Sequence, residues 1–192
     1  MNEVTAEIVR EFLDYNPETG EFVWKFRDRK YCKDNRSWKI GNTKRTGKNA
    51  GSVYPNGYRY ITIFHKDYLA HRLAWLYVYS EWPRDQLDHI NNRPNDNRIE
   101  NLREATQSQN MMNRSKLSET SSQYKGVSWH HLRNKWRARL HIDGKEIHLG
   151  LFTIEEEAAR TYDRAAIEHF GIYANLNFPI EDYLDYIEEL AA

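Results

Sequence analysis

The sequence contains only one cysteine, Cys32, among its 192 residues. A single cysteine cannot form a disulfide within the chain and cannot build a cysteine-based zinc cluster. No apolar run approaches the roughly 20 residues that a membrane-spanning helix needs. The first residues, MNEVTAEIVREF, are acidic and amphipathic and lack the basic start and apolar core of a signal peptide. These absences predict an intracellular, cytoplasmic protein with no membrane partner.

The chain also lacks a net charge, because 28 Lys and Arg residues balance 28 Asp and Glu residues. The charges are nevertheless distributed unevenly. Residues 24–50 carry ten Lys/Arg against two Asp, and residues 121–150 carry six against two acids, whereas residues 1–23 and 151–192 have net charges of −5 and −8. Basic segments flanked by acidic ones fit a nucleic-acid-binding surface backed by a solvated one, or a mixed-charge surface without a partner.

Polar residues and strong turn signals meet in the stretch 82–114. A strand over 86–90 should contain Asp88 and His89, and the turn formers NNRPNDN predict a wide loop before a second strand near 98–102. The sequence TQSQ at 106–109 has the pattern of a capping box, which predicts a short helix. Strand, loop, strand and helix would bring four polar side chains to one place: Asp88, His89, Asn101 and Asn110.

Such a cluster suits metal-assisted phosphodiester hydrolysis. A carboxylate and an amide carbonyl supply oxygen ligands to a hard divalent cation and leave positions for phosphate and water. A neutral His beside them can take a proton from the attacking water near pH 7, and an Asn that accepts from its other ring nitrogen would fix the tautomer. The alternative is a solvated Asn-rich loop with a surface Asp–His pair.

The same stretch resembles the HNH endonucleases, specifically their phage-type subgroup, in the pattern D-H-I-N…N-R-I-E-N-L-R…Q-N…N-R. The resemblance implies that Asp88 and Asn110 are metal ligands, that His89 is the general base and that Asn101 orients it. Asn110 stands where the family's eponymous pattern ends in His, which favours Mg²⁺ or Mn²⁺ over a tightly bound transition metal. His71 is interpreted as buried or phosphate-contacting, with a metal-site role as the alternative.

Apolar spacing and turn signals predict four further elements before this cluster. They are a helix over 5–13, a strand over 21–24, strand-like segments around an Asn-Gly turn at 56–57, and an apolar helix over 69–79. The segment 25–50 is basic, poor in aliphatic residues and rich in helix breakers. It is predicted to be a long loop or arm, disordered or ordered on DNA, that would neutralise phosphates. A plain solvated loop is the alternative.

A different pattern follows the polar, Ser-rich stretch 115–122, which is predicted to be a linker. Alternating residues and an Asp143-Gly144 turn predict a three-stranded antiparallel sheet. Its strands are expected at 126–131, 135–142 and 145–149. One face of this sheet is apolar and the other carries Arg and His. A capping box at 153–156 predicts the helix that covers the apolar face.

This second segment resembles the AP2 (AP2/ERF-like) DNA-binding domain through Y-K-G-V, K-W-R-A-R, H-L-G-L-F, E-E-A-A-R-T-Y-D and N-L-N-F-P. The resemblance implies a sheet that lies in the major groove of duplex DNA. The corresponding polar-face residues are Lys125, Ser128, His130, Arg137, Arg139, His141, Glu146 and His148. Arg137 and Arg139 are expected to contact guanine or phosphate, and the alternative for them is a solvated sheet face.

Together the two resemblances imply an α+β chain, with a ββα-metal (HNH) nuclease module carrying extra β-hairpins and an AP2-like sheet with one helix. The expected divisions are an N-terminal part packed on the module (1–67), the HNH core (68–114), the linker (115–122), the AP2-like domain (123–179) and an acidic C-terminal helix (180–192). The expected function is that of a homing-type, site-specific endonuclease that nicks double-stranded DNA. It is expected to act as a monomer with one divalent metal and no small-molecule cofactor, in a bacterial or phage-infected cell. The alternatives are an AP2-type regulator with an inactive HNH module and a structural or RNA-binding protein.

Overall fold

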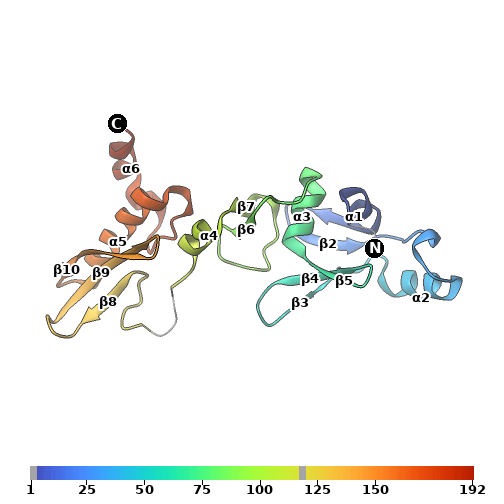
Figure 1. The fold of residues 1–192 in the computed structure, drawn as a ribbon, viewed down its shortest axis with the longest axis horizontal. Coiled ribbons are helices and arrows are strands. Elements are labelled where there is room, and N and C mark those ends of the chain that lie inside the picture. The colour runs from blue at the N-terminus through green and yellow to red at the C-terminus, as the bar shows by residue number, and fades with distance from the viewer. Residues whose placement is uncertain (1–3, 117–119) are drawn as a thin grey trace. The chain divides into compact units, whose positions relative to one another are not determined.

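A computed structural model describes residues 4–116 and 120–192 of the chain (Figure 1). Residues 117–119 of the predicted linker lie outside the described part. The chain divides into two compact units, Met1–Ala105 and Thr106–Ala192. The described residues form six α-helices and four small antiparallel sheets, so the mixed α and β composition is confirmed. In these residues, no helix has both the length and the apolar character that crossing a membrane requires.

The first unit contains three helices and three sheets of two or three strands. Its elements are α1 (Ala6–Phe12), β1 (Leu13–Asn16), β2 (Glu21–Trp24), η1 (Arg29–Tyr31), α2 (Asn35–Arg45), β3 (Ser52–Val53), β4 (Arg59–Ile63), β5 (Lys66–Leu69), α3 (Ala70–Tyr79), β6 (Gln86–His89), η2 (Ile99–Asn101) and β7 (Leu102–Ala105). The predicted helices over 5–13 and 69–79 and the predicted strand over 21–24 are confirmed as α1, α3 and β2.

One apolar core holds the first unit together. It takes buried side chains from α1, the β1–β2 hairpin, β4 and α3, and it includes Leu102 at the start of β7. Phe12, Phe22 and Leu73 are fully buried within it. Burial of apolar surface stabilises a fold by about 25 cal/mol per Å². The core therefore fixes α3 and the start of β7, where the β6–β7 loop ends.

The basic segment 25–50 is folded, so the prediction of a loop or arm is wrong for the residues of α2. The Asp34 carboxylate accepts the Ser37 N–H at 2.7 Å and caps this helix. No residue of α2 is buried, so the helix lacks the apolar stripe by which a helix is usually recognised in a sequence. With no apolar stripe, the local sequence feature that indicates this helix is its N-cap residue, Asp34.

The second unit is a three-stranded sheet with helices. Its elements are α4 (Gln107–Asn113), β8 (Val127–His130), β9 (Lys135–Ile142), β10 (Lys145–Phe152), α5 (Glu155–Phe170), η3 (Gly171–Tyr173), η4 (Ile180–Tyr183) and α6 (Leu184–Ala191). The strand order is β10-β9-β8, with every pair antiparallel. Asp143 and Gly144 both have positive φ, 49° and 78°, as a tight hairpin turn requires. The predicted sheet is thus confirmed.

Helix α5 covers the apolar face of this sheet. Its alanines and Tyr162 pack against Ala138 and Leu140 of β9. A Cβ atom at Gly126 would lie 2.0 Å from the Tyr162 ring, so only glycine allows this close approach. The predicted capping box at Thr153 is wrong: Ile154 is the N-cap and makes no side-chain cap hydrogen bond. Three glutamates in the first turn favour the helix start through the helix dipole instead.

A buried carboxylate ties the end of the chain to α5. Asp163 accepts the backbone N–H groups of Asn177 and Phe178 at 2.9 and 3.0 Å, the Asn177 amide at 2.9 Å and the Tyr183 hydroxyl at 2.8 Å. Asp163 is completely covered. Paired donors of this kind are what allow a carboxylate to be buried. The N-L-N-F-P sequence therefore serves a structural purpose.

Candidate functional site

The β6–β7 hairpin carries the first two predicted site residues. Asp88 lies opposite Arg103 and His89 lies opposite Leu102 in the antiparallel register. The second strand begins later than the predicted 98–102, because the 3-10 turn η2 precedes it. Asp88 and His89 are only 4% and 5% exposed. A carboxylate and an imidazole thus occupy the last two positions of one strand, in surroundings where electrostatic interactions are stronger than in water.

Arg103 fixes the Asp88 carboxylate. Both the Nε and Nη2 groups of Arg103 donate to Asp88 Oδ2, at 2.8 and 2.7 Å. A guanidinium that donates twice holds its partner in a defined orientation. Removal of one member of a buried pair leaves an uncompensated charge, at a cost of about 3–5 kcal/mol. The pair therefore fixes the position of Asp88 Oδ2 at the end of the strand.

The His89 ring lies among polar and aromatic side chains. Its Nε2 is 3.5 Å from Asn97 Oδ1, and its ring packs edge-on against His71 at 4.9 Å between centroids. Because Oδ1 is an acceptor, this contact favours the tautomer that carries the proton on Nε2. Burial lowers the pKa of His89, and the Asn97 contact and Asp88 oppose that shift. His89 is therefore neutral near pH 7, as a proton acceptor must be.

His71 of α3 is buried at 5% exposure, which agrees with the first of its two predicted roles. Burial, followed by the charge of a protonated His89 and by Arg72, lowers the pKa of His71 to about 3. Its ring also packs against Tyr58, at 5.5 Å between centroids. His71 is thus a neutral packing partner of His89 at ordinary pH.

We expect acid to destabilise the first unit through His71. The unfolded residue binds a proton near pH 6.5 and the folded one only near pH 3, so the unfolded state binds more protons between these values. Stability therefore falls as the pH falls through this range, by about 1.4 kcal/mol per pH unit for one such residue. Urea unfolding of the parent and of His71→Gln without added metal, at about pH 7 and about pH 5, measures this effect. The same difference between the two proteins at both pH values would contradict the expectation.

Asn101 organises the loop that follows His89. Its side-chain oxygen accepts the Asn91 N–H at 3.0 Å, and its amide donates to Asn91 Oδ1 at 3.1 Å and to the Asp96 carbonyl at 2.8 Å. Its backbone carbonyl accepts the Ile90 N–H at 3.0 Å. The side chain of Asn101 is therefore engaged with the loop, and the contact to the His89 ring comes from Asn97.

The N-terminal hairpin braces this loop from outside the predicted cluster. The Tyr15 hydroxyl donates to the Asn97 carbonyl at 2.7 Å. A Cβ atom at Gly20 would lie 2.5 Å from the Arg98 nitrogen, so glycine allows the β1–β2 turn to touch the loop. The Arg98 guanidinium in turn holds the pKa of Asp96 at about 2. Sequence reasoning missed Tyr15 and Asn97; Asn97 lies in a run of turn formers that only a tertiary contact distinguishes.

Asn110, the last member of the predicted cluster, lies on α4 in the second unit. The capping box predicted for this helix is confirmed in both halves: Gln109 N–H donates to Thr106 Oγ1 at 3.2 Å, and Thr106 N–H donates to Gln109 Oε1 at 2.8 Å. No group of three or more His, Cys, Asp or Glu side chains within residues 4–116 and 120–192 could hold a metal. One carboxylate with amide oxygens is a donor set for Mg²⁺ or Mn²⁺ completed by water, and it does not suit a tight transition-metal site.

Seven of the predicted DNA contacts share one face of the β8–β9–β10 sheet. The register places Ser128 opposite Arg137, and residues that lie directly opposite in an antiparallel pair share a face. Arg139 donates to Glu146 at 2.8 Å. The same register places the others on this face: His130, His141 and His148. Three buried polar atoms on this face lack a hydrogen-bond partner among the described residues, namely Ser128 Oγ, His130 Nδ1 and Arg137 Nε.

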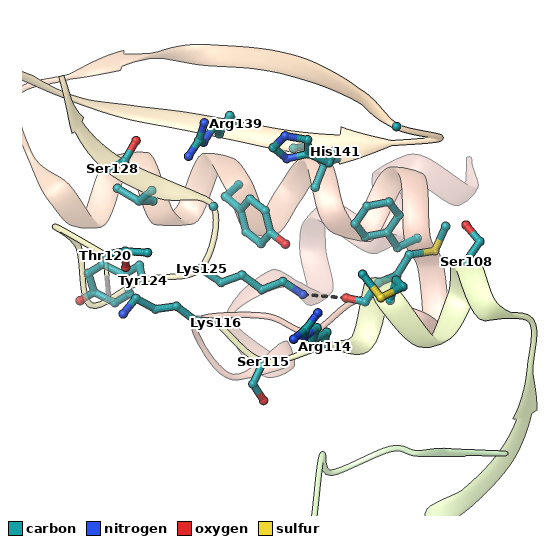
Figure 2. Close-up of a pocket in the computed structure, with 18 of the residues that line it drawn as sticks. Ser108, Arg114, Ser115, Lys116, Thr120, Tyr124, Lys125, Ser128, Arg139 and His141 are labelled. Carbon is teal, nitrogen blue, oxygen red and sulfur yellow. Dashed lines mark hydrogen bonds between the residues drawn. The ribbon is translucent and has the colours of Figure 1, made fainter. Parts of the chain in front are cut away.

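Lys125 differs from these seven. Its ammonium donates to the Met112 carbonyl at 2.6 Å, near the end of α4, as the dashed line in Figure 2 marks. It lines a cavity of about 580 Å³ within the second unit, together with Arg139 and His141. Burial lowers the pKa of Lys125 to about 8. The structure therefore engages this lysine inside the unit.

Comparison with known proteins adds two findings to this geometry. The HNH endonuclease family matches residues 68–112, which contain α3, the β6–β7 hairpin and most of α4. A stretch of 70 residues is 40% identical to APETALA2-like protein 2 of Oryza sativa, and 71 residues are 39% identical to the AP2-like ethylene-responsive transcription factor TOE2 of Arabidopsis thaliana. The chain combines an HNH domain with an AP2-like domain.

The AP2-like match is partial in both directions. It covers 36% and 37% of this chain but only 16% and 15% of the two relatives. The Arabidopsis thaliana factor PLT2 is 45% identical over 69 residues, 12% of its length. The HNH match, for its part, includes Asp88, His89, Asn101 and Asn110.

Proposed function

We propose that this protein is a metal-dependent DNA endonuclease of the homing type, which nicks double-stranded DNA at sites selected by its AP2-like sheet. One observation carries the proposal: within the HNH match, the buried carboxylate of Asp88 and the buried, neutral imidazole of His89 occupy the last two positions of β6. A carboxylate and a proton acceptor on one rigid strand are the pair that metal-assisted phosphodiester hydrolysis needs.

The residues of the hairpin would then have separate tasks. His89 takes a proton from the attacking water, and Asn97 and the loop ordered by Asn101 hold its ring. Asp88, with Asn110 as the second proposed ligand, holds the cation. A bound Mg²⁺ or Mn²⁺ would stabilise the negative charge that develops on the phosphate and on the leaving oxygen. One such site in a monomer cuts one strand.

The AP2-like sheet would select the site. Arg139 is paired with Glu146, whereas Arg137 has no ion pair among the described residues and its buried Nε has no hydrogen-bond partner there. A guanidinium can donate twice to a guanine edge in the major groove. We therefore assign base contact first to Arg137. Base recognition and strand cleavage are then performed by different parts of the chain.

A DNA-binding regulator with an inactive HNH domain is the second candidate function. Two observations favour it: the AP2-like relatives are transcription factors, and Asp88 Oδ2 is already engaged by Arg103. A regulator would bind duplex DNA through the same sheet and would leave it intact.

Nicking of a plasmid library tests the proposal. Supercoiled plasmids that carry random duplex inserts are incubated with the protein and Mg²⁺ or Mn²⁺, and the positions of nicks are sequenced. We expect nicks at a shared sequence, and a chelator of divalent cations should abolish them because the site holds only oxygen ligands for such a cation. Selective duplex binding without nicks under any of these conditions would decide for the regulator.

A further inference from the structure

The basic segment around α2 has almost no internal charge compensation. Its only acids are Asp28 and Asp34, against ten Lys and Arg residues between 24 and 50. Both carboxylates accept backbone N–H groups at the starts of η1 and α2, Lys30 N–H at 2.8 Å and Ser37 N–H at 2.7 Å. The two acids of this segment thus cap helices, and they are too few to neutralise the positive charge of the segment.

The ten cations fall into two groups. Half have a partner within the first unit: for example, Lys30 pairs with Glu11 at 3.3 Å, and Arg45 lies over the Trp24 ring at 5.3 Å. The side chains of the other half have no hydrogen bond, ion pair or ring contact with the described residues, and all are exposed. These are Lys33, Arg36, Lys39, Lys44 and Lys48.

Two of the unpartnered cations of α2 lie on the side of the helix that faces away from the rest of the unit. Trp38 Nε1 and the Asn42 amide both donate to the Arg27 carbonyl, at 2.8 and 3.0 Å, and so mark the inward side of α2. At about 100° per residue, positions 36 and 44 lie on the opposite side, whereas position 39 lies at the margin, beside Trp38 and Asn42. The outward face of α2 is therefore defined here by Arg36 and Lys44, with the exposed Lys39 at its margin.

Both flanks of α2 are fastened to the unit. Before the helix, the Tyr31 hydroxyl donates to Glu11. After it, Trp24 N–H donates to the Lys48 carbonyl at 2.9 Å and Gly47 N–H donates to the Trp24 carbonyl at 2.8 Å. Charges on a helix held in this way lose less conformational freedom on binding than charges on a disordered arm.

We propose that the outward face of α2 is a second DNA-binding surface, which contacts the phosphate backbone of the duplex that the AP2-like sheet selects. The inference rests on the proposed function, because it takes duplex DNA as the partner. Arg36 and Lys44 are separated by about 12 Å along the helix axis. Duplex DNA carries one charge per roughly 1.7 Å, so all three cations find phosphates within that span. Contacts of this kind add affinity and position the protein without reading bases.

The salt dependence of binding tests this surface. The dissociation constant of the full chain for one selected duplex is measured over a series of salt concentrations, for the parent and for Arg36→Gln/Lys39→Gln/Lys44→Gln. The slope of log K against log salt should become shallower by about 0.9 per lost phosphate contact, or nearly 3 in total. Binding should weaken most at low salt, and the relative preference for the selected duplex should stay the same.

The matched control keeps the charges and exchanges the side chains: Arg36→Lys/Lys39→Arg/Lys44→Arg should retain the parental slope. Thermal melts show that all three proteins are equally folded. A parental slope in the glutamine variant overturns this surface and leaves the endonuclease proposal intact. A parent that binds no duplex DNA overturns both. A slope that falls as strongly in the charge-preserving control also overturns the inference, because the effect is then not one of charge.

Discussion

Replacing His89 with alanine is expected to lower the nicking rate by about 10²–10⁴-fold, which is the usual contribution of a positioned general base. The neutral, buried His89 directly follows Asp88 on β6, and no other residue of the hairpin offers a nitrogen base there. Binding to the selected duplex should not change, because the AP2-like sheet lies in the other unit. Single-turnover nicking with Mg²⁺ and a separate binding titration measure the two effects.

His169→Ala is the matched control for this substitution. His169 is exposed in the last turn of α5, and alanine is compatible with a helix there. This variant should nick at the parental rate. Equal nicking by His89→Ala and the parent would show that His89 takes no proton from the attacking water. Loss of binding by His89→Ala would show that the substitution disturbs more than catalysis.

Features specified by neighbouring residues were predictable from the sequence. The capping box at Thr106 depends on a spacing of three residues, and the turn at Asp143-Gly144 on two adjacent residues that tolerate positive φ. The apolar helix α3 follows from periodicity alone. Asp88 and His89 therefore lie on a strand, as predicted, because each element around them is encoded locally.

Features specified by distant residues were not predictable in this way. Asn97 contacts His89 because the β1–β2 hairpin braces the loop, through Tyr15, which is 82 positions away in the sequence. Helix α2 has no apolar stripe, and its tertiary anchors are the single side chains of Trp38 and Asn42. Lys125 follows the pattern of the polar face but reaches Met112 instead. In each case a tertiary contact overrides the local pattern.

The Asp163 carboxylate in α5 shows what one residue of the E-E-A-A-R-T-Y-D motif does in the fold. Asp163 is a buried residue of α5, and its carboxylate accepts hydrogen bonds from Asn177, Phe178 and Tyr183. Hydrogen bonds to a carboxylate are stronger than those between neutral groups. Each buried donor that loses its acceptor costs about 1–3 kcal/mol. The network therefore stabilises the packing of the C-terminal segment against α5.

Asp163→Ala is accordingly expected to destabilise the second unit by about 3–5 kcal/mol, since four donated hydrogen bonds lose one fully buried acceptor and partial relaxation recovers some of the cost. Denaturant unfolding of the full chain measures this change. Asp182→Ala is the matched control, because it removes the same side chain from an exposed ion pair with Arg160 and should cost no more than about 1 kcal/mol. Tyr183→Phe removes a single donor from the network and should cost much less than Asp163→Ala. Similar losses for Asp163→Ala and Asp182→Ala would contradict the assignment of Asp163 as the acceptor that fixes the end of the chain.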